Sequence, residues 1–139
     1  MASFIQRHFV PVKIHIKQQP ETFKRFGAQW TPTMLILDPE GEERHRFEGF
    51  LPAPEFLGQL ALGLARTDFG RERWEKAEER FAEVLRRFPD TAAAPEALYW
   101  AGVAKYKRTG DGAALAETHQ AFQKRYPDST WATKASVWG

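Results

Sequence analysis

The sequence predicts an α/β region followed by an all-α region. The hydrophobic period changes repeatedly in residues 1–66, whereas residues 71–139 keep the period of amphipathic helices. A five-residue sequence, Arg87–Thr91, also recurs in similar form as Arg125–Ser129. Such a repeat is typical of stacked helical hairpins. We therefore divide the chain into an α/β domain at residues 1–66 and a helical repeat region at residues 71–139.

The composition is that of a folded globular protein and excludes several function classes. Apolar residues make up 42% and charged residues 27% of the 139 residues, which disfavours a disordered chain. The 20 basic and 18 acidic side chains are interleaved, so we expect neither nucleic acid nor a membrane surface as a partner. No apolar run reaches the roughly 18 residues of a membrane span. Residues 1–8 lack the pattern of a signal peptide, which makes the cytoplasm the default expectation.

Alternating and continuous apolar runs predict three strands in the α/β region. Residues 10–16 alternate apolar and polar side chains, which is typical of a strand with one buried face. A short helix is expected from Pro20 to Gly27. The apolar run at residues 33–37 predicts a buried strand, and a Pro-Gly turn returns the chain as an antiparallel edge strand at residues 43–47.

Helical stripes account for the remainder of the chain. One helix is expected to begin at Pro54 and end near Arg66, and further helices follow from Arg71. Pro89 and Gly110 interrupt the later helices. Three glycines inside helices, which predict close packing against a neighbouring element, are Gly58, Gly63 and Gly102.

An ordered set of short segments resembles the later part of a thioredoxin-like domain. The resemblance covers roughly residues 3 to 65. The segments are Phe9–Ile14, Phe26–Gly27, Trp30–Thr33, Asp38–Gly41 and Gly49–Phe50. The most specific element is Thr31-Pro32-Thr33, which resembles the cis-proline loop of that family.

This resemblance implies a site for an extended peptide at Trp30, Thr31 and Pro32. In the family, a cis bond before this proline shapes the surface that faces the reactive dithiol, and neighbouring main-chain groups pair with a substrate peptide. A simpler interpretation stays open, because Pro32 could only lead the chain into a strand and Trp30 could pack in the core.

The chain also departs from the family pattern. Thioredoxin-like domains begin with a strand and a Cys-x-x-Cys motif, and this sequence contains no cysteine. By family analogy the missing strand lies between those expected at residues 10–16 and 33–37. Either these two strands pair directly as a parallel βαβ unit, which is the fold we predict, or another chain fills the gap.

The helical region resembles tetratricopeptide-type repeats. Ala77, Phe81 and Pro89 match spaced consensus positions of such repeats. The resemblance implies a protein or peptide partner. Basic residues that are candidates for a groove binding an acidic peptide are Arg86, Arg87, Lys105, Lys107 and Arg108. Self-association through an exposed sheet edge or through the last helix is a further expectation.

We find no pattern that predicts a catalytic residue, a metal site or a cofactor. The histidines His8, His15, His45 and His119 lack the spacing of metal ligands. We expect His15 and His45 to lie in an exposed basic stripe on the polar faces of two strands.

The favoured interpretation is a non-catalytic protein-interaction module without redox-active cysteines. The alternative is the C-terminal portion of a thiol-disulfide oxidoreductase whose Cys-x-x-Cys lies upstream, with Pro32 lining its active site. A third, weaker hypothesis is a helical-repeat adaptor in which the α/β region serves only as a platform.

Overall fold

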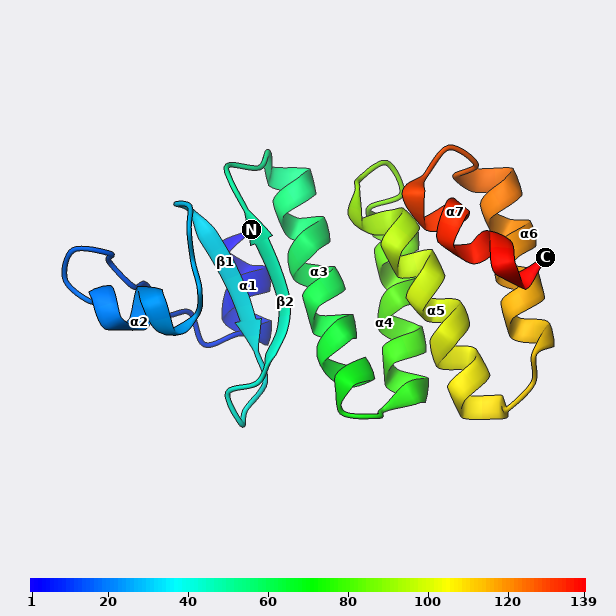
Figure 1. Cartoon of the computed structure of the whole chain (residues 1–139), viewed down its shortest axis with the longest axis horizontal. Coiled ribbons are helices and arrows are strands. Elements are labelled where there is room, and N and C mark those ends of the chain that lie inside the picture. Colours follow the sequence, from blue (N-terminus) through cyan, green and yellow to red (C-terminus); the bar gives the residue numbers. More distant parts are fainter.

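A small antiparallel sheet lies near one end of the molecule, and the helices from residue 53 onward stack beside it (Figure 1). The computed structural model describes all residues, 1–139. Its elements in chain order are α1 (Ala2–His8), α2 (Pro20–Arg25), β1 (Thr33–Leu37), β2 (Glu43–Glu48), α3 (Ala53–Gly70), α4 (Trp74–Arg87), α5 (Ala93–Thr109), α6 (Ala113–Arg125), α7 (Thr130–Ala135) and a final 3-10 turn (Ser136–Trp138).

The antiparallel hairpin of β1 and β2 confirms two of the three predicted strands. Thr33 pairs with Glu48, and the register continues to Ile36 opposite His45 before a bulge. Asp38 fixes the turn, because its carboxylate accepts hydrogen bonds from the main-chain N–H groups of Glu40 and Glu42. The turn therefore closes around a buried acidic side chain, as an Asx turn does.

The predicted strand at residues 10–16 is wrong, and with it the parallel βαβ unit. The sheet contains β1 and β2 alone, and residues 10–16 form neither helix nor strand. Val10 is 91% exposed and Val12 is 76% exposed. A period-2 pattern makes one face of a strand apolar, but the strand also needs a neighbour for its main chain and a surface on which to pack. Neither is available to this segment.

Helix α3 connects the sheet with the helical region, because it is buried on two opposite sides. A side chain at Gly63 would collide with Ile36 of β1, and one at Gly58 would press on Thr91 in the turn between α4 and α5. Both glycines therefore permit the close packing that the sequence predicts. The helix extends to Gly70, so the proposed division of the chain at residue 66 falls within it and stays a prediction.

The helical region consists of two similar hairpins, α4–α5 and α6–α7 (Figure 1). Their turns share one geometry: Phe88 after α4 has φ −130° and ψ 48°, and Tyr126 after α6 has φ −137° and ψ 56°. The Tyr126 hydroxyl donates a 2.8 Å hydrogen bond to the Pro89 carbonyl, which joins the two turns. The repeated sequence thus produces a repeated structure, while its assignment to the tetratricopeptide type stays a prediction.

Close packing of α5 on α6 at Gly102 leads to a stability prediction. A Cβ atom there would collide with the Thr118 side chain, which is buried in α6. We expect Gly102→Ala to lower the free energy of unfolding by about 1–3 kcal/mol, because the two helices must move apart. Chemical denaturation measures this change. Gly112→Ala is the matched control, since nothing lies within 4 Å of its added Cβ; equal stabilities of the two variants would contradict the packing argument.

Candidate functional site

The loop before β1 holds the three residues singled out as a peptide-binding site. The Thr31–Pro32 peptide bond is cis, as the sequence resemblance implies. The Thr33 hydroxyl donates a hydrogen bond to the Trp30 carbonyl, and the Gly49 N–H donates to the Pro32 carbonyl at 2.8 Å. These bonds fix the loop against the end of β2. Trp30 is 66% exposed, so it does not pack in the core.

The outer edge of β1 is free along its length. Residues of an antiparallel strand alternate between pairs that exchange hydrogen bonds and pairs that do not. Because Gly49 donates to Pro32, the alternation turns the N–H and C=O groups of Thr33 and Leu35 away from β2. No other segment hydrogen-bonds to these groups. The edge is therefore an unpaired row of donors and acceptors beside Pro32.

Exposed apolar side chains lie at the end of β1, after β2 and in the segment at residues 10–16. Leu37 is partly exposed at its far end, and Phe50 is 89% exposed just after β2. In the segment at residues 10–16, the exposed apolar side chains are Val10, Val12, Ile14 and Ile16. Unpaired main-chain groups of a sheet edge are the groups with which an added strand forms hydrogen bonds.

His45 lies in a different environment from the exposed stripe that we expected. It is buried on the face of β2 that packs against α3, and its Nε2 lies 2.7 Å from Oε1 of Gln59. The alternation of His45 with buried Phe47 was the signal that could have placed it there. His15 lies in the turn before α2, outside the sheet.

Burial is the main cause of a lowered pKa at His45. The loss of hydration disfavours the charged imidazolium, and this effect outweighs the hydrogen bond to Gln59 and the charge of Glu96, which act to raise the pKa; the nearby Arg66 lowers it further. At Asp38, burial acts to raise the pKa, but hydrogen bonds from the Glu42 N–H and from Arg44 outweigh it and hold the pKa below its usual value. Both groups support the hairpin rather than its open edge.

Arg46 occupies the opposite face of β2. Its guanidinium donates to the Phe26 carbonyl at the end of α2 and to the carboxylate of Glu43. Arg46 is therefore the polar link that holds the α2 segment to the sheet.

The basic residues proposed as a groove in the helical region are largely paired. Arg108 binds Glu78 at 2.8 Å, and Lys105 binds Glu117 at 2.8 Å. Arg87 binds Glu83 within α4 at 3.1 Å. These ion pairs reduce the charge that this surface offers to an acidic peptide.

No group of three or more histidine, aspartate or glutamate side chains is placed to hold a metal ion. None of the helices combines the length and the apolar character needed to cross a membrane.

The buried His45 predicts a stability that depends on pH. Its pKa in the folded protein lies below the value of about 6.5 expected for the unfolded chain. The unfolded chain therefore takes up a proton first, and the folded state loses stability as the pH falls from above 6.5 through the lowered pKa. We expect His45→Gln to reduce this loss in denaturation curves measured from pH 7.5 downward. His15→Gln, in an exposed turn, should keep the dependence of the unaltered protein, and an unchanged slope in His45→Gln would contradict the assignment.

One comparison with known proteins gives a match. A family model described as "Thioredoxin-like domain" matches residues 1–63. Neither the curated proteins nor the solved structures yield a match to the chain. The matched region contains α1, α2, the hairpin and the first part of α3, and it confirms the resemblance seen in the sequence. Residues 1–63 are therefore similar to a thioredoxin-like domain, and the chain contains no cysteine.

Proposed function

We propose that this chain is a non-catalytic protein-interaction module whose thioredoxin-like domain binds an extended segment of a partner protein along the outer edge of β1. The observation that carries the proposal is the unpaired main chain of Thr33 and Leu35 beside Trp30, Thr31 and Pro32. In a chain without a thiol, this edge can bind a peptide but cannot exchange disulfides with it.

Strand addition would satisfy the groups that the edge leaves free. A peptide that pairs with β1 accepts from and donates to Thr33 and Leu35, and its alternate side chains contact the two faces of the sheet. Long open edges are normally covered or disrupted by charge, because they otherwise pair with other chains. The side chains of β1 from Met34 to Leu37 are all apolar, so this edge has no such protection.

We propose that the segment at residues 10–16 pairs with the second side of the bound strand. Its alternating sequence has the pattern of a strand with one apolar face, yet it has no neighbour in the free protein. A peptide inserted between β1 and this segment gives both sides a hydrogen-bonding partner. Binding is then coupled to ordering of residues 10–16, which costs affinity but adds contact surface.

A proline at position 35 tests the edge directly. The N–H of Leu35 points away from β2, so Leu35→Pro removes one donor for an incoming strand and leaves the pairing with β2 in place. We expect Leu35→Pro to weaken binding of a synthetic peptide of alternating valine and threonine at least about tenfold, measured by NMR titration of the main-chain amides. Leu35→Val keeps the N–H and is the matched control.

The same titration distinguishes other occupants. Equal peptide affinities of Leu35→Pro and Leu35→Val, with both variants folded, would refute strand addition at β1. Concentration-dependent dimerisation that only Leu35→Pro abolishes would assign the edge to a second copy of the chain. Dimerisation that neither variant affects would point to the C-terminal helix instead, where Val137 is exposed.

The absence of cysteine leads to a prediction about disulfide reduction. The chain contains no cysteine and hence no thiolate nucleophile. We expect no reduction of a disulfide-linked substrate above the buffer rate in an insulin-type turbidity assay with a catalytic thioredoxin as positive control. Measurable turnover would refute a non-catalytic role.

A second function is favoured by the family match over residues 1–63. In this alternative the chain is the C-terminal portion of a thiol-disulfide oxidoreductase, and Pro32 lines an active site completed by an upstream Cys-x-x-Cys. The genomic sequence upstream of Met1 separates the two. An in-frame strand followed by the cysteine motif would favour the oxidoreductase, and an immediate in-frame stop codon would eliminate it.

A further inference from the structure

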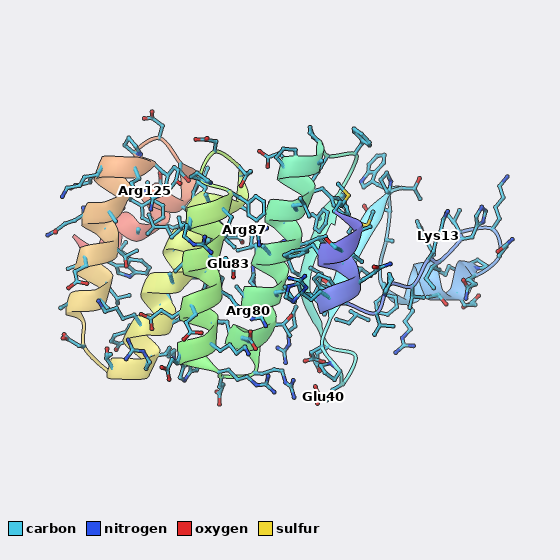
Figure 2. The ribbon with its side chains drawn as sticks, turned by 180° about the vertical axis from the view of Figure 1, so that it is seen from behind. Lys13, Glu40, Arg80, Glu83, Arg87 and Arg125 are labelled. Carbon is cyan, nitrogen blue, oxygen red and sulfur yellow. The ribbon has the colours of Figure 1, made fainter.

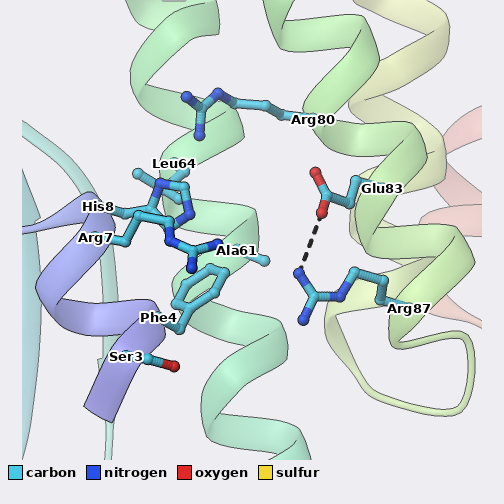
Figure 3. Close-up of a pocket in the computed structure, with 9 residues that line it drawn as sticks. All are labelled: Ser3, Phe4, Arg7, His8, Ala61, Leu64, Arg80, Glu83 and Arg87. Carbon is cyan, nitrogen blue, oxygen red and sulfur yellow. Dashed lines mark hydrogen bonds and ion pairs between the residues drawn. The ribbon is translucent and has the colours of Figure 1, made fainter. Parts of the chain in front are cut away.

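A basic cavity lies where α1 meets α3 and α4, remote in sequence from the edge of β1 (Figure 3). Its volume is about 310 Å³. Arg7 and His8 enter from α1, and Arg80 and Arg87 enter from α4 (Figure 3). Figure 2 shows Arg80, Glu83 and Arg87 along the same side of α4. Four groups that can carry positive charge therefore line the cavity. Two come from α1 and two from α4, which lie far apart in the sequence.

Negative charge in the cavity does not balance these groups. Glu83 is the only acidic residue of the lining, and its carboxylate lies 3.1 Å from the guanidinium of Arg87. Arg80 forms an ion pair with Asp68, which is not part of the lining. The Asp68 carboxylate lies 2.8 Å from the Nε of Arg80 and 3.6 Å from the guanidinium of Arg73. Arg7 makes no ion pair with any acidic side chain. The cavity therefore keeps an excess of positive charge.

The floor and one side of the cavity are apolar. The Phe4 ring packs at 4.7 Å from the His8 ring, and the guanidinium carbon of Arg87 lies 5.9 Å from the centre of the Phe4 ring. Ala61 and Leu64 of α3 complete this surface. Phe4 also packs against the buried residues on both sides of α3, so α1 is anchored to α3 through this ring.

We propose that this cavity binds an oxyanion, a phosphate or carboxylate group, between the guanidinium groups of Arg7, Arg80 and Arg87. Guanidinium groups match the geometry of such anions and donate two hydrogen bonds at once. The anion would relieve the repulsion between like charges on α1 and α4 and would join the thioredoxin-like domain to the helical region. The apolar surface at Phe4 and Leu64 accommodates the carbon atoms that carry the anionic group.

The electrostatics of His8 agree with this geometry. Burial is the first cause of its lowered pKa, and the charges of Arg80 and Arg7 lower it further. These surroundings disfavour the protonated form of the His8 imidazole. An anion in the cavity would favour the protonated form and so raise the pKa of His8.

The experiment is a titration of the full chain with sodium phosphate, sodium acetate and sodium chloride at matched ionic strength, followed by NMR shifts of the α1 and α4 amides. We expect saturable binding of phosphate, acetate or both, and none of chloride. Arg7→Gln and Arg87→Gln should weaken the binding about 3- to 10-fold. Glu83→Gln should tighten it, because it removes the negative charge of the lining.

Arg86→Gln is the matched control, since Arg86 neighbours Arg87 on α4, also lies near Glu83, and is outside the cavity lining. We expect its affinity to equal that of the unaltered protein. Saturation by phosphate alone would identify a phosphate group as the ligand, and saturation by acetate alone a carboxylate. The proposal is overturned if neither anion saturates, or if Arg7→Gln and Arg87→Gln, with unchanged melting temperatures in chloride, bind as tightly as Arg86→Gln.

Discussion

The burial of α3 on two opposite sides is the constraint on which the rest of the structure depends. One side carries Gly63 against Ile36 of the sheet, and the other carries Ala61 and Ala65 among the buried residues of α4 and α5. Small side chains at these positions let three layers approach closely enough to exclude water. A hairpin of two strands is marginally stable by itself, so the sheet exists here because α3 covers it, and α3 in turn is held by the helical region.

This dependence explains why the edge of β1 can stay open. The hairpin gains its burial through the face that contacts α3 and α1, where Ile36, His45 and Phe47 lie. Pairing along the outer edge is therefore not required for the hairpin to form. The helical region lies beyond α3, on the side of β2, whereas the free edge of β1 faces the other way (Figure 1). A strand that adds to β1 would displace neither α3 nor the helices beyond it, and α2 lies on the side from which it would approach (Figure 1).

The sequence predicted correctly the elements that depend on local pattern, and the prediction was wrong for the strand at residues 10–16, which depends on a neighbouring strand. The helices after residue 71 and the hairpin at residues 33–48 follow from periodicity and turn residues, and the structure confirms them. Residues 10–16 have an equally clear period, but a strand forms only where another strand accepts its hydrogen bonds. The pattern indicates which face of a strand would be buried, but it does not indicate whether a neighbouring strand is present.

The loop at Trp30, Thr31 and Pro32 could be identified from the sequence, whereas the basic cavity could not. Trp30, Thr31 and Pro32 form a contiguous motif, so a resemblance could single them out, and their loop is held as a unit against Gly49. The basic cavity draws Arg7 from α1 and Arg80 from α4, which are far apart in the sequence and belong to different regions of the fold. Each of these arginines alone is indistinguishable from a solvated surface residue. Their convergence arises only because α1 and α4 both pack against α3, so the contact that stabilises the fold is also the one that creates the cavity.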